Sequence, residues 1–313
     1  MNSSQAHPPL VVIVGPTAAG KSSLSVFLAR AFGGEVVACD STQLYRGFNI
    51  GTAKPSVEER AGVRHHLLDV LDAGEASTAG GYRERALAVL QDLRARGVLP
   101  IFTVGTGLYL RALLEGLAPL PQRSEELRAR LRAAAAEHGP GHLHEMLERL
   151  DPETARQIAA TDGQKLIRAI EICLLTEKPV SEIHRQGREP LEGWRVLKLG
   201  LRPQRERLND RIHARTEAML RAGWLEEVRG LMRQDTGENA KPFDFIGYRE
   251  LRAHLRGEMT LEAAKQLIQQ GTRQYAKRQL TWFRRESSVH WIAGFGDEAG
   301  TQGQARDWLA ENL

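Results

Sequence analysis

The sequence has very little cysteine and no long apolar run. Only Cys39 and Cys173 occur among 313 residues, which excludes a disulfide-stabilised secreted fold and a cysteine-rich zinc site. No apolar stretch approaches the roughly 20 residues that cross a bilayer. The N-terminal residues also lack the basic and apolar regions of a signal peptide. We therefore expect a cytoplasmic protein with no membrane partner.

The remaining composition is that of a globular protein with a substantial core. Hydrophobic residues make up 42% of the chain and charged residues 26%. The length allows two domains, or one α/β core with an insertion. The formal charge of +4 is mildly basic, which permits a nucleic-acid partner without requiring one.

A glycine-bounded loop follows the first apolar run. Residues 10–14 have the pattern of a buried strand, and residues 15–22 fill the motif G-x-x-x-x-G-K-S before a helix-forming segment. In such a loop, backbone N–H groups and a helix N-terminus converge on one phosphate, and the lysine reaches the next. The serine hydroxyl is placed to bind Mg²⁺. The motif therefore predicts a polyphosphate site formed by Gly15, Pro16, Thr17, Ala18, Ala19, Gly20, Lys21 and Ser22.

Predicted strands and helices alternate in the first third of the chain. After a helix that starts at Lys21 and ends at Gly33, strands are expected at 35–39, 66–71 and 98–104. A helix is expected over about 82–96, and strand patterns return at 195–201 and 289–292. This order predicts an α/β fold, a P-loop NTPase-like parallel sheet covered by helices.

The segment 115–192 has helical patterns only. Helices are expected over 124–137 and 164–177, and Asp151-Pro152 is suited to an N-cap followed by the first helical position. We therefore expect a P-loop core with C-terminal helices formed by residues 1–114 and 193–313. An all-helical insertion domain would interrupt it at 115–192.

Asp40 ends the second predicted strand. Ligands of doubly wound sheets lie beyond the carboxyl ends of the strands, so Asp40 is expected to face the ligand of the loop. A turn or N-cap aspartate would explain the position equally well. Asp69 is only a weak candidate for the acid of a nucleotide-hydrolysing enzyme, and the strand at 98–104 is followed by Gly-Thr-Gly. The sequence thus shows no clear hydrolysis machinery.

Arg215 falls on the apolar stripe of a helix that begins near Gln204. A buried arginine requires an anionic partner, which here is either a carboxylate or a bound phosphate. Arg211, one turn earlier, is ambiguous in the same way.

The segment 271–285 interleaves five basic residues with Tyr275, Trp282 and Phe283. Basic side chains neutralise phosphates and aromatic rings stack on exposed bases, so this composition suits RNA. An amphipathic helix whose aromatic residues pack in the core explains it nearly as well. Gln164 and Arg168 likewise suit either a groove contact or an ordinary polar face.

Taken together, these segments resemble the tRNA dimethylallyltransferase (isopentenyl-tRNA transferase) family of the bacterial type. The family's motifs occur in order over nearly the whole chain, and the combination of 51–55 with 276–279 is highly specific. Two positions depart from the family pattern: Val104 replaces a glycine, and Ile170 replaces a leucine. The zinc-finger extension of eukaryotic members is absent. The matching segments are 15–22, 40–47, 50–55, 64–69, 105–110, 247–250 and 275–284.

The resemblance implies a prenyl transfer. Dimethylallyl diphosphate would donate its five-carbon group to N6 of adenosine 37, beside the anticodon of tRNAs that read codons starting with U. Lys21, Arg215 and Mg²⁺ on Ser22 would stabilise the leaving diphosphate. Asp40 would accept the N6 proton, and Thr17 would lie near the reaction channel.

The resemblance also implies that the adenosine is flipped out and that the insertion domain holds the anticodon stem. Nothing in the sequence requires more than a monomer. The tRNA contacts implied residue by residue are Asp40, Ser41, Thr42, Gln43, Thr106, Arg128, Gln164, Lys165, Leu166, Ile167, Arg168, Gly247, Tyr248 and Arg249.

Two other functions remain consistent with the loop motif. A P-loop small-molecule kinase would bind ATP and use Asp40 to activate a hydroxyl, but it leaves the basic and aromatic segment unexplained. A nucleotide-switched RNA-binding protein would show RNA affinity that responds to ATP or GTP and no covalent product.

Overall fold

The computed structural model describes residues 7–118, 120–185, 187–234 and 240–313. The chain divides into two compact units, Met1–Leu113 with Glu192–Leu313, and Leu114–Leu191. We call them the α/β unit and the helical unit. Each has a hydrophobic core of its own.

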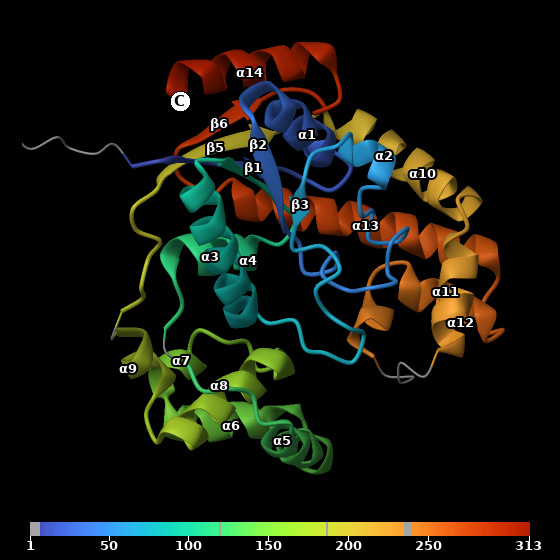
Figure 1. Cartoon of the computed structure of the whole chain (residues 1–313). Coiled ribbons are helices and arrows are strands. Elements are labelled where there is room, and N and C mark those ends of the chain that lie inside the picture. Colours follow the sequence, from blue (N-terminus) through green and yellow to red (C-terminus); the bar gives the residue numbers. More distant parts are fainter. Residues whose placement is uncertain (1–6, 119, 186, 235–239) are drawn as a thin grey trace, which may run out of the picture. The chain divides into compact units, whose positions relative to one another are not determined.

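The α/β unit is built on one sheet of six parallel strands in the order β3-β2-β4-β1-β5-β6 (Figure 1). The strand β1 lies in the middle, with its Val11 beside Ile101 of β4 and Leu197 of β5. Because a central parallel strand is covered on both faces, a continuous apolar run is what such a position requires. The expected α/β class is confirmed. The strands are β1 (Pro9–Val14), β2 (Gly34–Cys39), β3 (His65–His66), β4 (Leu99–Val104), β5 (Arg195–Leu201) and β6 (Val289–Ile292).

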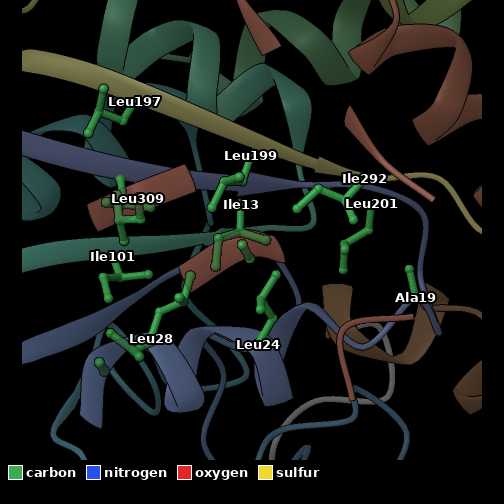
Figure 2. Close-up of a cluster of buried hydrophobic side chains, with 14 residues drawn as sticks. Ile13, Ala19, Leu24, Leu28, Ile101, Leu197, Leu199, Leu201, Ile292 and Leu309 are labelled. Carbon is green, nitrogen blue, oxygen red and sulfur yellow. The ribbon is translucent and has the colours of Figure 1, made fainter. Parts of the chain in front are cut away.

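Two helices pack on one face of this sheet. Figure 2 shows Ile13 and Leu199 of the sheet against Leu24 and Leu28 of α1 and Leu309 of α14. Such burial of branched apolar side chains is the main stabilising term of the unit. Its helices are α1 (Lys21–Phe32), α2 (Val57–Arg60), α3 (Ala79–Arg96), α4 (Gly107–Glu115), α10 (Arg205–Arg221), α11 (Trp224–Arg233), a 3-10 turn at Lys241–Asp244, α12 (Tyr248–Leu255), α13 (Leu261–Phe283) and α14 (Ala299–Asn312).

The helical unit packs short helices around Leu147, Leu166 and Ile170. Asp151 caps α7 as expected, because its carboxylate accepts a hydrogen bond from the backbone N–H of Thr154 at 3.0 Å. Within the described ranges, no helix of the protein combines the length and apolar composition needed to cross a bilayer. The helices of this unit are α5 (Glu125–His138), α6 (Pro140–Leu150), α7 (Pro152–Ala155), α8 (Gly163–Thr176) and α9 (Val180–Arg185).

The strand expected at 66–71 is wrong beyond its first residue. The chain leaves the sheet after His66, with φ of 61° at Leu67 and 57° at Asp69. The Asp69 carboxylate binds the ammonium of Lys54 at 2.5 Å, and the Lys54 side chain is only 3% exposed. An apolar pattern cannot reveal a left-handed turn that closes around a buried lysine from another segment. Asp69 is therefore a structural anion.

Candidate active site

The loop over residues 15–22 joins the central strand β1 to α1. Gly15 has a φ of 148°, and a Cβ at this position would lie 2.9 Å from the carbonyl oxygen of Leu201. Gly20 has a φ of 84° and serves as the N-cap of α1 without contributing a side-chain cap. The first N–H groups of the helix are thus available to an anion.

Lys21 folds back over this loop. Its ammonium donates hydrogen bonds to the carbonyl oxygens of Gly15 at 3.0 Å and Pro16 at 2.8 Å. Burial lowers the pKa of Lys21 to about 8; the Asp40 carboxylate opposes this shift, and the Arg215 guanidinium adds to it. An anionic ligand in the loop would stabilise the ammonium and raise that pKa again.

Asp40 lies directly after β2, at the same edge of the sheet. Its Oδ1 accepts hydrogen bonds from the backbone N–H of Thr42 at 2.9 Å and from the Thr42 hydroxyl at 2.7 Å. Its Oδ2 lies where a side chain on Gly105 would have to be, so a Cβ at Gly105 would overlap it. Asp40 is therefore both a turn aspartate and a residue of the site, and the two interpretations left open by the sequence are not exclusive.

Two cavities share Thr17, Ala18, Asp40, Thr52 and Arg215 among the residues that line them. The phosphate cavity, of about 460 Å³, is lined by the loop residues Gly20, Lys21 and Ser22 and also by Arg211. The second cavity, of about 290 Å³, which we call the apolar cavity, has among its lining residues the apolar side chains of Ile212, Met219, Trp224, Phe245, Ile246 and Ile268. A cavity at the loop over residues 15–22 thus adjoins a second cavity with apolar residues in its lining, and Asp40 lines both.

Arg215 lines both cavities from α10. Its Nη1 donates to the hydroxyl of Thr17 at 3.5 Å, and burial lowers its pKa. Within the part of the chain that the structure describes, Arg215 forms no ion pair with a carboxylate. The Asp40 carboxylate nevertheless acts on Arg215, because it opposes the lowering of the Arg215 pKa by burial. A phosphate partner for Arg215 therefore stays a prediction.

Several side chains of the motif at 275–284 are buried and form hydrogen bonds within the protein. Gln279 is 6% exposed; its amide oxygen accepts from the N–H of Thr17 at 2.7 Å, and its amide nitrogen donates to the carbonyl of Gly105 at 2.8 Å. The Tyr275 hydroxyl donates to the same carbonyl at 2.9 Å. Phe283 is fully buried, whereas Trp282 is 36% exposed. One face of this helical segment therefore packs in the core. The only sequence signal for the two side chains that bind the Gly105 carbonyl is the four-residue spacing of Tyr275 and Gln279.

Trp224 and Glu227 of α11 hold the segment at 49–51, and sequence reasoning identified neither residue. Glu227 accepts hydrogen bonds from the backbone N–H groups of Asn49 at 3.0 Å and Ile50 at 2.8 Å. The indole of Trp224 packs so closely on Gly51 and Gly247 that a Cβ on either glycine would overlap it. Neither contact has a signal in the periodicity of the chain.

The residues expected to contact tRNA from the α/β unit are only partly available. Thr106 meets Ser41, since the backbone N–H of Ser41 donates to the Thr106 hydroxyl at 2.9 Å. The side chain of Arg249 is 65% exposed. Tyr248 is fully buried and donates to Glu227 at 2.6 Å, so its side chain is a core residue. The tRNA contact expected at Tyr248 remains a prediction, and only the backbone of this residue could make it.

In the helical unit, Arg128 and Arg168 share the buried carboxylate of Glu171. Arg128 Nε donates to it at 3.2 Å and Arg168 Nη1 at 2.6 Å. Leu166 is fully buried, so only its backbone can meet a ligand, whereas the side chain of Lys165 is 71% exposed. The tRNA contacts expected at 164–168 stay predictions.

The phosphate cavity has oxygen donors that suit Mg²⁺. The Ser22 hydroxyl lines it together with the carboxylates of Asp40 and Glu59. Among the described residues, no group of three or more histidines, cysteines or carboxylates could hold a metal ion unaided. Mg²⁺ usually keeps several waters and uses one or two protein oxygens plus the phosphates of a substrate, so these residues fit it when a diphosphate is also bound.

Comparison with known proteins gives a consistent result. The sequence model of the IPP transferase family matches residues 43–286. The tRNA dimethylallyltransferase of Koribacter versatilis is 52% identical over 95% of this chain and 97% of its own length, and that of Solibacter usitatus is 47% identical over 97% and 99%. The crystal structure of the tRNA isopentenylpyrophosphate transferase from Bacillus halodurans aligns with a TM-score of 0.71 at 35% identity, covering 97% of this chain and 96% of that one. A eukaryotic dimethylallyltransferase acting on tRNA aligns with a TM-score of 0.82 at 26% identity, covering 97% and 80%.

Proposed function

Because this chain belongs to the IPP transferase family, we propose that it transfers a dimethylallyl group from dimethylallyl diphosphate to N6 of adenosine 37 in tRNAs that read codons starting with U. One observation carries this proposal in the structure. The carboxylate of Asp40 belongs to both the phosphate cavity and the apolar cavity, so a charged leaving group, an apolar chain and a base can meet there.

The donor's diphosphate occupies the loop over residues 15–22. The N–H groups at the start of α1, the ammonium of Lys21 and the guanidinium of Arg215 stabilise the charge that grows on it as it leaves. The Ser22 hydroxyl would hold Mg²⁺ together with the diphosphate, and the ion would supply further positive charge to the leaving group when bound. The loop therefore contributes to the chemical step and does not couple ATP hydrolysis to it.

Asp40 acts as the general base. The N6 nitrogen of the adenine forms a bond to C1 of the donor, the C1–O bond to diphosphate breaks, and the N6 proton passes to the Asp40 carboxylate. The two hydrogen bonds from Thr42 fix that carboxylate in one orientation. Thr17, which contacts both Arg215 and Gln279, positions the loop beside it.

The protein acts as a monomer in the cytoplasm. It binds the anticodon stem-loop of the tRNA, with adenosine 37 flipped out of the stack. In the helical unit, Arg128 and residues 164–168 contact the tRNA, Leu166 through its backbone; in the α/β unit, the contacts come from residues 40–43, Thr106 and 247–249. Contacts of basic side chains with the phosphates make the affinity salt-sensitive.

A transfer assay tests the proposal. The protein is incubated with Mg²⁺, radiolabelled dimethylallyl diphosphate and unmodified tRNA that carries adenosines at positions 36 and 37. Label is expected in the tRNA, and a tRNA with guanosine at position 37 serves as the control. Phosphate release from ATP without any labelled tRNA would instead support the kinase alternative.

A further inference from the structure

An ion pair lies beside the phosphate cavity, outside the machinery described so far. The guanidinium of Arg211 donates from Nη1 to Asp297 Oδ1 at 2.8 Å and from Nη2 to Asp297 Oδ2 at 2.5 Å. Arg211 lines the phosphate cavity one helical turn before Arg215, and the guanidinium contributes to lowering the pKa of Arg215. Two arginines of α10 therefore line the same cavity, and among the described residues only Arg211 of the two forms an ion pair with a carboxylate.

The segment after β6 fixes Asp297 directly behind the phosphate-binding loop. The N–H of Gly296 donates to the carbonyl of Ala19 at 2.9 Å. A Cβ on Gly20 would lie 2.9 Å from Asp297 Oδ1, so the carboxylate packs against the last glycine of the loop. The hydrogen bond of Gly296 thus holds the backbone next to Asp297 against the phosphate-binding loop.

This placement brings the Asp297 carboxylate close to the site expected for the diphosphate, with the Arg211 guanidinium beside both. A carboxylate next to a diphosphate is unfavourable because like charges repel, although the Asp297 side chain is 41% exposed and water weakens the repulsion. In the free protein, Arg211 balances the charge of Asp297 by binding both of its carboxylate oxygens. The buried ring of Phe295 lies 4.5 Å from the guanidinium and restricts where it can go.

We propose that Arg211 is a second arginine on the diphosphate and that the Asp297 carboxylate competes with the diphosphate for it. The inference rests on the proposed function. With the donor bound, Arg211 contacts the diphosphate; after transfer, attraction to Asp297 and repulsion between the two anions promote release of the product. Asp297 is therefore a residue that weakens product binding.

The neighbouring pair Arg207–Glu298 is a matched control. It joins the same helix to the same segment at 2.7 Å, one turn earlier, and Arg207 also lies over Phe295 at 5.1 Å. Arg207 is not among the residues that line the phosphate cavity. Substitutions there report on the structural value of such a pair without touching the phosphate site.

The experiment measures binding of inorganic diphosphate with Mg²⁺ to the full-length protein by calorimetry. Loss of a charge-assisted hydrogen bond in Arg211→Gln should weaken binding about 10- to 100-fold. Asp297→Asn should tighten it several-fold, and Arg211→Lys should retain part of the affinity. Arg207→Gln and Glu298→Gln should stay within about twofold of wild type.

The opposite signs expected for the two partners separate this role from a structural one, which would change binding in one direction. Weakening by both Arg211→Gln and Asp297→Asn, or wild-type affinity in both, would overturn the inference. Melting temperatures identify variants that fail to fold, and Arg211→Lys replaces Arg211→Gln in the comparison if Arg211→Gln is one of them. Wild-type affinity in a folded Asp297→Asn protein by itself also contradicts competition. A wild-type protein that binds no diphosphate and labels no tRNA would instead overturn the proposed function.

Discussion

The backbone N–H of Thr17 and the side-chain oxygen of Gln279 are joined by a 2.7 Å hydrogen bond across 262 residues of sequence. The other end of the same amide donates to the carbonyl of Gly105, which follows β4. One buried side chain thus connects the phosphate-binding loop, the glycine against Asp40 and the C-terminal helix α13. The geometry of the site depends on this connection.

Replacing Gln279 with leucine should leave the N–H of Thr17 without its partner and the Gly105 carbonyl with only Tyr275. Each buried polar group left unpaired costs about 1–3 kcal/mol. We expect a lower midpoint of urea unfolding and a higher KM for dimethylallyl diphosphate, both measured on the purified variant. Gln274→Leu is the control, because Gln274 is exposed on the same helix. Equal effects of the two substitutions would show that Gln279 has no special role.

Replacing Asp40 with asparagine should remove the general base with little change in shape. Loss of positioned base catalysis lowers kcat by about 10²-fold or more, whereas donor binding should persist because the phosphate-binding groups are intact. Single-turnover transfer and calorimetric binding of the donor measure the two effects separately. Thr42→Val, which removes one hydrogen bond to the carboxylate, should cause a smaller loss. Near-normal turnover in Asp40→Asn would exclude Asp40 as the base.

Donor binding should depend on pH through Lys21, whose pKa is lowered to about 8 in the free protein, first by burial. The diphosphate binds the protonated ammonium, so affinity is full below this pKa and falls as the pH rises through it, by up to roughly tenfold per pH unit. Binding at pH 8 to 9 should also take up protons, which calorimetry in buffers of different ionisation enthalpy detects.

Lys21→Arg supplies the control for this pH profile. Arginine stays protonated over the whole range, so its profile should be flat above the final ionisation of the donor's phosphate, near pH 6. A wild-type profile as flat as that of Lys21→Arg would contradict a role for Lys21 titration.

Gly51→Ala should strongly destabilise the protein, because the new methyl group overlaps the indole of Trp224. Overpacking of this kind costs about 1–3 kcal/mol or more. The double variant Gly51→Ala/Trp224→Leu has a smaller side chain facing the new methyl group. It should therefore lose less unfolding free energy than the two single variants lose in sum. Gly230→Ala, on the same helix as Trp224 and with open space around it, should be neutral or stabilising by up to about 1 kcal/mol. If denaturant unfolding shows that the free-energy losses of the two single variants simply add in the double variant, the expected overlap between position 51 and Trp224 is refuted.

The sequence by itself determined the phosphate-binding loop, most strands and the helical character of the segment after residue 114. These features depend on local patterns: glycines at fixed spacing before a lysine, apolar runs of strand length, and caps such as Asp151. Local sequence also placed Asp40 at the carboxyl end of β2, where a parallel sheet brings strand ends together. Arg215 was identified as a buried cation, with its partner left open.

The tertiary structure alone decided what these residues meet. Arg211 and Arg215 lie one turn apart on α10 and both line the phosphate cavity, but only Arg211 binds Asp297. Gln279, Glu227 and Trp224 act on segments far away in the sequence, so no local period could indicate their partners. The short β3 is a further example, because Asp69 pairs with Lys54 from another segment and the chain turns with positive φ at Leu67 and Asp69. A pattern reports which face of an element is buried, whereas only the packed chain fixes the charges and backbone groups that are buried with it.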